Sequence, residues 1–219
     1  MTLNPTLIYV FWKSDESIEN YDLQLTFTPA SYKEGVQSTL DDFPGMTIAS
    51  WQQRPDSIGY VRARSADPFD DPTILGNYLA ADEDRRALRE GVRMAREVVA
   101  QAALDPYRDA EYAPGADVRT DADLDAWIRA RSETIYHPVG TCRMGAAGDA
   151  MAVVDDQLRV QGVAGLRVID ASVMPTLVGG NTNAPTIMIA ERAADLLLGK
   201  AMLPAMDAPV FEDGRAVAA

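Results

Sequence analysis

Two short runs in the C-terminal half of the sequence hold the residues best suited to chemistry. His137, the only histidine, lies in the run 136–145, and Asn181 lies in the glycine-rich run 179–186. A histidine ordinarily titrates near ~6.5, so it can accept a proton at neutral pH. An amide does not titrate, but it can donate a hydrogen bond to a developing oxyanion. The two residues are therefore a plausible catalytic pair for chemistry that removes a hydroxyl proton.

Other interpretations of these residues stay open at this point. A lone histidine can serve a purely structural role. A metal site is disfavoured because the chain has no second histidine and has only a single cysteine. That cysteine, Cys142, could act as a nucleophile beside His137, but no nucleophile-elbow pattern surrounds it. The aspartates of the loop 65–73 predict a solvated connection, because their spacing lacks the alternation of an EF-hand loop.

The elements ahead of these runs predict an antiparallel sheet followed by helices. Strands are expected at 6–12, around 23–27, at 47–52 and at 58–64. A helix begins near Asp82, with Leu88, Val92, Ala95, Val98 and Ala102 as its apolar stripe and its arginines on the solvated face. A second helix has Thr120 and Asp123 in capping-box positions, and Leu124, Trp127 and Ile128 on its buried side.

Beyond residue 150 the pattern predicts a strand, a turn and a helix. Residues 153–160 suggest a hairpin, and 166–170 an apolar strand that ends in Asp170. A helix is expected from Pro185 to Leu198, with Pro185 in its first turn and Gly199 after its end. Such a helix start, preceded by a glycine-rich turn, can hold an anionic cofactor, although a plain β-turn-α element would look the same.

Composition narrows the class of protein. The chain has 219 residues with 20 basic and 33 acidic side chains, so its net charge is −13. This balance argues against nucleic-acid binding. One cysteine fits a reducing compartment, and neither a signal peptide nor a membrane span is visible. The expected location is cytoplasmic, with peripheral contact at the inner membrane as the alternative.

Several motifs in order resemble one known family. Residues 136–145, 166–175 and 179–195 are similar to the C-terminal signature of the glucose–methanol–choline (GMC) flavoprotein oxidoreductases, and residues 59–79 resemble their substrate-domain sheet. The similarity extends to about Gly199 and looks closest to bacterial primary-alcohol and choline dehydrogenases. It implies an α+β fold that combines the antiparallel substrate-domain sheet, its helices and the last strand-turn-helix of an FAD-binding lobe.

The resemblance also implies a function and a set of site residues. It implies hydride transfer from a primary alcohol to the flavin of FAD, with His137 as base and Asn181 as second catalytic residue. The implied FAD contacts are Asp170, Ala171, Asn181, Thr182, Asn183, Ala184 and Pro185. An electron acceptor such as quinone or oxygen completes the expected partners.

The family's N-terminal dinucleotide fingerprint, G-x-G-x-x-G, is absent from the sequence. We therefore expect residues 1–150 to form a substrate lobe with the histidine segment, 151–200 a piece of the FAD lobe, and 201–219 a weakly ordered tail. The expected partner is the missing N-terminal FAD-binding half. Alternatives are an inactive remnant, an interaction module without FAD, and a choline dehydrogenase or aryl-alcohol oxidase relative.

Overall fold

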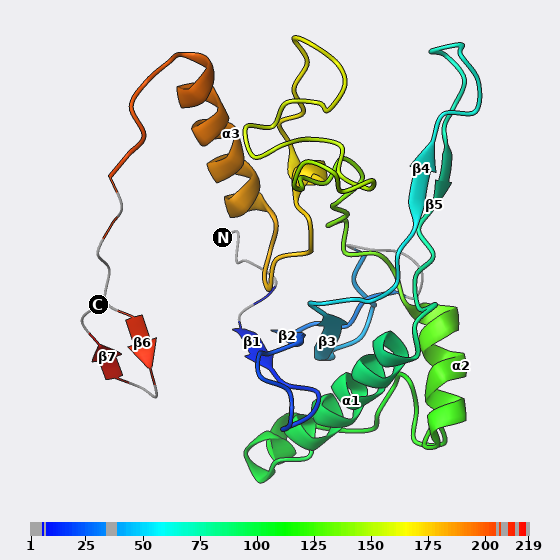
Figure 1. Ribbon diagram of the computed structural model, residues 1–219. Coiled ribbons are helices and arrows are strands. Elements are labelled where there is room, and N and C mark those ends of the chain that lie inside the picture. The colour runs from blue at the N-terminus through cyan, green and yellow to red at the C-terminus, as the bar shows by residue number, and fades with distance from the viewer. Residues whose placement is uncertain are drawn as a thin grey trace. The chain divides into compact units, whose positions relative to one another are not determined.

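The computed structural model describes residues 6, 8–33, 39–204, 206, 210–212 and 215–217, with side chains described up to residue 206 (Figure 1). Two compact units emerge from the contacts of the chain. The first contains Met1–Thr141 and Thr176–Thr182, and the second contains Cys142–Pro175 and Asn183–Ala219. The first unit thus ends at Thr141 and not at the expected 150. It also includes the short segment Thr176–Thr182, which precedes the last long helix. The lobe roles expected for 1–150 and 151–200 stay a prediction.

A three-stranded antiparallel sheet is the base of the first unit. It consists of β1 (Ile8–Trp12), β2 (Leu23–Thr28) and β3 (Thr47–Gln52), in the order β1-β2-β3. These strands lie where β-branched and aromatic residues predicted them. The central strand differs from the expected half-buried pattern, because Gln24 and Thr26 are buried as well as Leu23 and Leu25. A strand between two neighbours can be covered on both faces, which alternation of residue types did not reveal.

The fourth predicted strand does not join this sheet. β4 (Tyr60–Arg62) pairs instead with β5 (Thr73–Leu75), which begins at the last residue of the expected loop 65–73. The two strands build a hairpin arm that extends away from the helices of its unit (Figure 1). The arm's tip is solvated, with Phe69 93% exposed, as the aspartate-rich sequence predicted. The expectation of one four-stranded sheet was therefore wrong.

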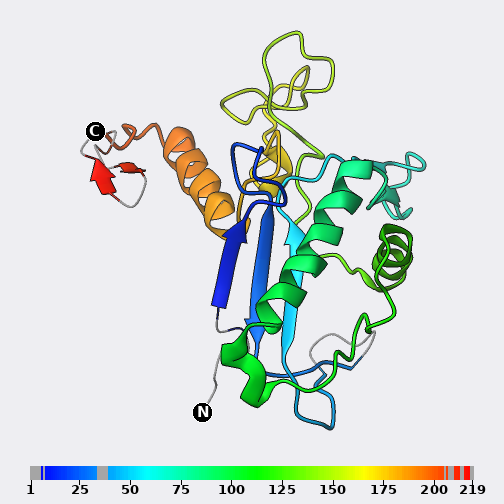
Figure 2. The ribbon, with the colours of Figure 1, turned by 90° about the horizontal axis from the view of Figure 1, so that it is seen from below.

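Helix α1 (Asp82–Val99) covers one face of the sheet (Figure 2). Leu23, Leu25 and Ala87 form the core between them. Gly91 allows the close approach, because a Cβ there would lie 2.5 Å from Ser50 Oγ. Helix α2 (Asp121–Arg131) packs against α1 and buries Leu124 and Ile128, as predicted. Its capping box between Thr120 and Asp123 is confirmed.

The buried stripe of α1 differs from the predicted one. Asp84, Ala87 and Gly91 face the core, whereas Val98 is 45% exposed. Two of its arginines are also largely buried: the side chains of Arg85 and Arg89 are 16% and 15% exposed, and both ion-pair with Asp125 of α2. The buried face of α1 thus contains a glycine and a carboxylate as well as an alanine. A count of apolar residues could not predict this face.

The second unit has little regular structure apart from one helix. Isolated bridges Val154↔Val160 and Arg159↔Arg167 replace the predicted hairpin and the predicted strand 166–170. The chain then forms the short 3₁₀ helix η2 (Ala171–Val173), whose Val173 shares a core with Val154, Leu158 and Ala193. Ala193 belongs to helix α3 (Asn183–Leu197). Gly199 ends that helix with φ of 65°, as predicted.

Much of α3 remains uncovered. Ile187 and Leu197, expected to be available for burial, are exposed, and Ala193 is its buried residue. Other short elements are the 3₁₀ helix η1 (Ala102–Tyr107) and the pair β6 (Val210–Glu212) and β7 (Arg215–Val217). Parts of the predicted tail 201–219 lie outside the described residues. Within the described part of the chain, no helix is long and apolar enough to cross a membrane.

Candidate active site

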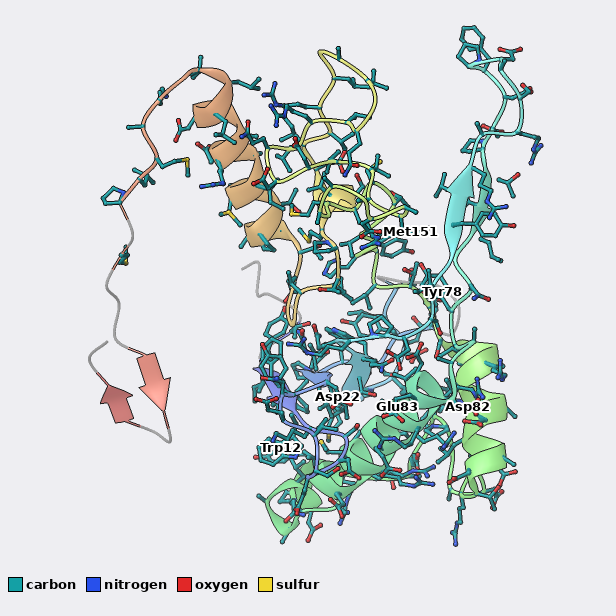
Figure 3. The ribbon with its side chains drawn as sticks, in the orientation of Figure 1. Trp12, Asp22, Tyr78, Asp82, Glu83 and Met151 are labelled. Atoms are coloured by element: carbon teal, nitrogen blue, oxygen red, sulfur yellow. The ribbon has the colours of Figure 1, made fainter. Side chains whose placement is uncertain are left out.

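The histidine segment follows α2 within the first unit. Tyr136, the residue before His137, adopts a left-handed conformation with φ of 58° although it is not glycine. Such a conformation costs about 1–2 kcal/mol and persists where neighbours impose it. The neighbour here is Thr134, whose Oγ1 accepts from the Tyr136 backbone N–H at 3.1 Å and contacts Tyr78 Oη at 3.1 Å. Tyr78 lies at the foot of the hairpin arm (Figure 3).

Asn181 reaches this histidine from the returning segment Thr176–Thr182. Its Nδ2 lies 3.2 Å from His137 Nε2, although 44 positions separate the two residues. His137 is half-buried and Asn181 is exposed, so solvent reaches the pair from the side of Asn181. An Asn N–H can donate to Nε2 when the imidazole is neutral and carries its hydrogen on Nδ1. The structure therefore brings together the two residues that the sequence proposed as a pair, and their catalytic roles stay a prediction.

The remaining candidate residues divide between the two units. Thr182 is buried in the first unit, next to Asn181. Asp170, Ala171, Asn183, Ala184 and Pro185 belong to the second unit. The Asp170 side chain caps η2 by accepting from the Ser172 N–H at 2.7 Å, and Ala171 is the first residue of that helix. Asn183, Ala184 and Pro185 form the first turn of α3, which contains no acidic residue. The cofactor contacts of these residues stay a prediction.

Two residues that the sequence did not single out line the turn of Asn181. A Cβ placed on Gly179 would lie 3.0 Å from Arg54 Nη2 and 3.2 Å from Tyr21 Oη. Tyr21 and Arg54 stand far from Gly179 in the chain, and neither belongs to a recognisable motif. Only the folding of the sheet brings them to the turn, so sequence reasoning had no signal for them.

Possible metal ligands and Cys142 are the other groups that the sequence raised. Within that part of the chain, no group of three or more His, Cys, Asp or Glu side chains could hold a metal ion. Cys142 is half-buried, and its backbone N–H donates to the Ser172 carbonyl at 3.0 Å. This bond ties Cys142 to the structure of the second unit.

Comparison with known proteins identifies the relatives. Residues 55–190 match the GMC oxidoreductase family model, which is more than half of the chain. An oxygen-dependent choline dehydrogenase from Vibrio vulnificus is 43% identical over 92% of this chain and 36% of its own length. Pyridoxine 4-oxidase from Mesorbium loti superposes with a TM-score of 0.77 at 27% identity, over 89% of this chain and 38% of that one.

A third relative bears on the cofactor. An FAD-dependent oxidoreductase from Chaetomium thermophilum superposes with a TM-score of 0.70 at 25% identity, over 82% of this chain and 28% of that one. The predicted family and the predicted α+β fold with antiparallel sheets are confirmed, and FAD is confirmed as the cofactor of relatives with this fold. The chain spans about a third of the length of its curated relatives, 36% for the Vibrio protein.

Proposed function

Because the chain belongs to the GMC oxidoreductase family, we propose that it is the C-terminal catalytic part of an FAD-dependent alcohol dehydrogenase. The reaction is hydride transfer from the CH–OH carbon of a primary alcohol. The observation that carries the proposal is the 3.2 Å contact between Asn181 Nδ2 and His137 Nε2, which joins the two residues of different motifs that such chemistry needs.

The pair acts on the hydroxyl group. FAD, when bound, supplies the hydride acceptor. His137 accepts the hydroxyl proton at Nε2, because an alkoxide expels hydride far more readily than an alcohol does. Before substrate binds, the Asn181 amide donates to that same nitrogen. An alcohol that binds there takes over Nε2 and receives an Asn181 N–H at its own oxygen. The amide thereby passes from stabilising the neutral base to stabilising the developing oxyanion.

The residues that would hold FAD fit such a group in two respects. The first turn of α3 lacks acidic side chains, so its free N–H groups and positive dipole end favour an electron-rich partner. A Cβ on Gly180 would meet no atom within 4 Å, so the backbone beside Asn181 is open to a ligand. We assign Asn183, Ala184 and Pro185 to the flavin ring and Asp170 and Ala171 to the phosphate and ribityl part.

The proposal includes partners that the chain itself does not contain. The dinucleotide fingerprint must come from another polypeptide segment, in the same or a partner chain. An electron acceptor, quinone or oxygen, must reoxidise the flavin. The name of the Vibrio relative makes choline the first alcohol to test, followed by simple primary and aryl alcohols.

The visible spectrum of the purified chain, with and without FAD, tests this function. An anaerobic primary alcohol is then added. We expect no stable flavin with the chain alone, and a bound flavin that the alcohol bleaches once the N-terminal half of a relative is supplied. A reconstituted flavoprotein that no alcohol bleaches would contradict the proposal. It would favour the remnant or interaction module instead.

A further inference from the structure

Asn181 is carried by a turn whose backbone rests on two side chains at one end of the sheet. Gly179 is the contact point: a Cβ there would lie 3.0 Å from Arg54 Nη2 and 3.2 Å from Tyr21 Oη, tighter than ordinary contact. A Cβ on the adjacent Gly180 would meet no atom within 4 Å. Gly179 therefore faces the Tyr21 and Arg54 side chains, which together we call the seat. Its neighbour Gly180 faces open space.

The seat is itself held by the strand ends. Tyr21 precedes β2 and Arg54 follows β3, and the residues next to them are joined by a bond of 2.6 Å from the Gln53 backbone N–H to the Asp22 carbonyl. Gln53 is buried, and its Nε2 donates to Gln24 Oε1 at 2.7 Å. This pairing brings Tyr21 and Arg54 to the same end of the sheet.

Further contacts fix Tyr21 and its neighbour Asp22. The Tyr21 ring lies 5.2 Å from the Phe11 ring, centroid to centroid. Asp22, labelled in Figure 3, accepts from the Ser14 backbone N–H at 2.7 Å and from Ser14 Oγ at 2.5 Å. The Arg54 guanidinium has no ion pair with any residue that the structure describes, and it borders an open cavity of about 270 Å³. No ion pair with a described residue therefore holds Arg54 away from the turn.

We propose that Tyr21 and Arg54 are positioning residues that set the separation between Asn181 and His137. They touch the turn two residues before Asn181 and need not touch substrate. Their effect on the pair is independent of the proposed function, and only their effect on turnover rests on it. A displacement of about 1 Å at reacting groups can lower a rate on the order of 10²-fold, so the seat matters for catalysis.

The single histidine allows a test that needs no flavin. The ¹⁵N resonance of His137 Nε2, recorded at fixed pH, should report whether Asn181 is in contact. The Asn181→Ala variant lacks the contact, so its resonance position is the reference for a His137 without Asn181 beside it. We expect Gly179→Ala, Arg54→Ala and Tyr21→Ala to move it more than half of the way there. The matched Gly180→Ala should leave it in place, and so should Tyr21→Phe, which keeps the ring against Gly179 and Phe11.

The outcomes separate the seat from a general loss of fold and from the proposed function. Melting temperature and circular dichroism identify any variant that unfolds, and Arg54→Ala and Tyr21→Ala are judged independently of Gly179→Ala. An unmoved resonance in all folded seat variants would overturn the proposal, as would an unmoved resonance in Asn181→Ala. In the reconstituted enzyme, Gly179→Ala should lower kcat severalfold with a smaller change in KM. Absence of alcohol oxidation there would contradict the function and leave the resonance result standing.

Discussion

At the residue scale, the proposed function divides the work between the imidazole of His137 and the amide of Asn181. In the reconstituted enzyme, His137→Ala should lower turnover by roughly 10²–10⁴, because a positioned base is lost. Asn181→Ala should lower it by about 10²–10³, the usual effect of removing one oxyanion donor. Rapid-scan measurement of flavin reduction checks both. The flavin absorbance before alcohol is the control, and near-normal turnover of His137→Ala would refute the assignment.

At the element scale, Asp84 ties the start of α1 to the loop after β3. Its buried carboxylate accepts from the Asp56 N–H at 2.8 Å and the Ser57 N–H at 3.0 Å, and also from Ser57 Oγ. Asp84→Asn should lower the free energy of unfolding by about 2–3 kcal/mol, because hydrogen bonds to a buried carboxylate are lost. Asp82→Asn, at an exposed position of the same turn, should change it by at most about 1 kcal/mol. Urea unfolding compares the two, and equal losses would argue against the anchor.

The capping box of α2 gives a pH dependence at the same scale. Hydrogen bonds from the Thr120 hydroxyl and backbone N–H hold the pKa of Asp123 below 3.8. A carboxyl with a lowered pKa in the folded state stabilises it above pH 3.8, and the contribution is lost as pH falls through the folded value. Asp123→Ala should therefore be less stable than wild type at pH ~7 and should approach it as pH falls through the folded-state pKa of Asp123. Urea midpoints across this range test the sign, and a gap that widens in acid would contradict it.

At the scale of the whole molecule, the apolar strand β1 is exposed along its entire length. All five of its residues are at least 40% exposed, and Trp12 is 59% exposed (Figure 3). Such an edge favours association with a further polypeptide. Co-expression with the N-terminal half of a relative should yield a complex that survives ~1 M salt, where charge contacts are screened within ~3 Å. Size-exclusion chromatography measures this. Dissociation by salt would show that ionic contacts dominate.

The sequence by itself determined the local elements and the chemical types of the site. β-branched and aromatic runs specified β1 and β3, Thr120 and Asp123 specified the start of α2, and Gly199 specified the end of α3. These features depend on neighbours within a few residues, which a sequence displays directly. The motif order likewise indicated His137 and Asn181 and the family.

Tertiary structure decided whatever depends on contacts between distant residues. It paired β4 with β5 and not with the central sheet, and it buried both faces of β2. It also selected Asp84, Ala87 and Gly91 as the buried residues of α1. It also placed Tyr21 and Arg54 under Gly179 and brought Asn181 to 3.2 Å from His137. Close approach depends on the shapes of surfaces that meet only after folding, so residue type and spacing could name the proposed catalytic pair but not the two side chains beside its turn.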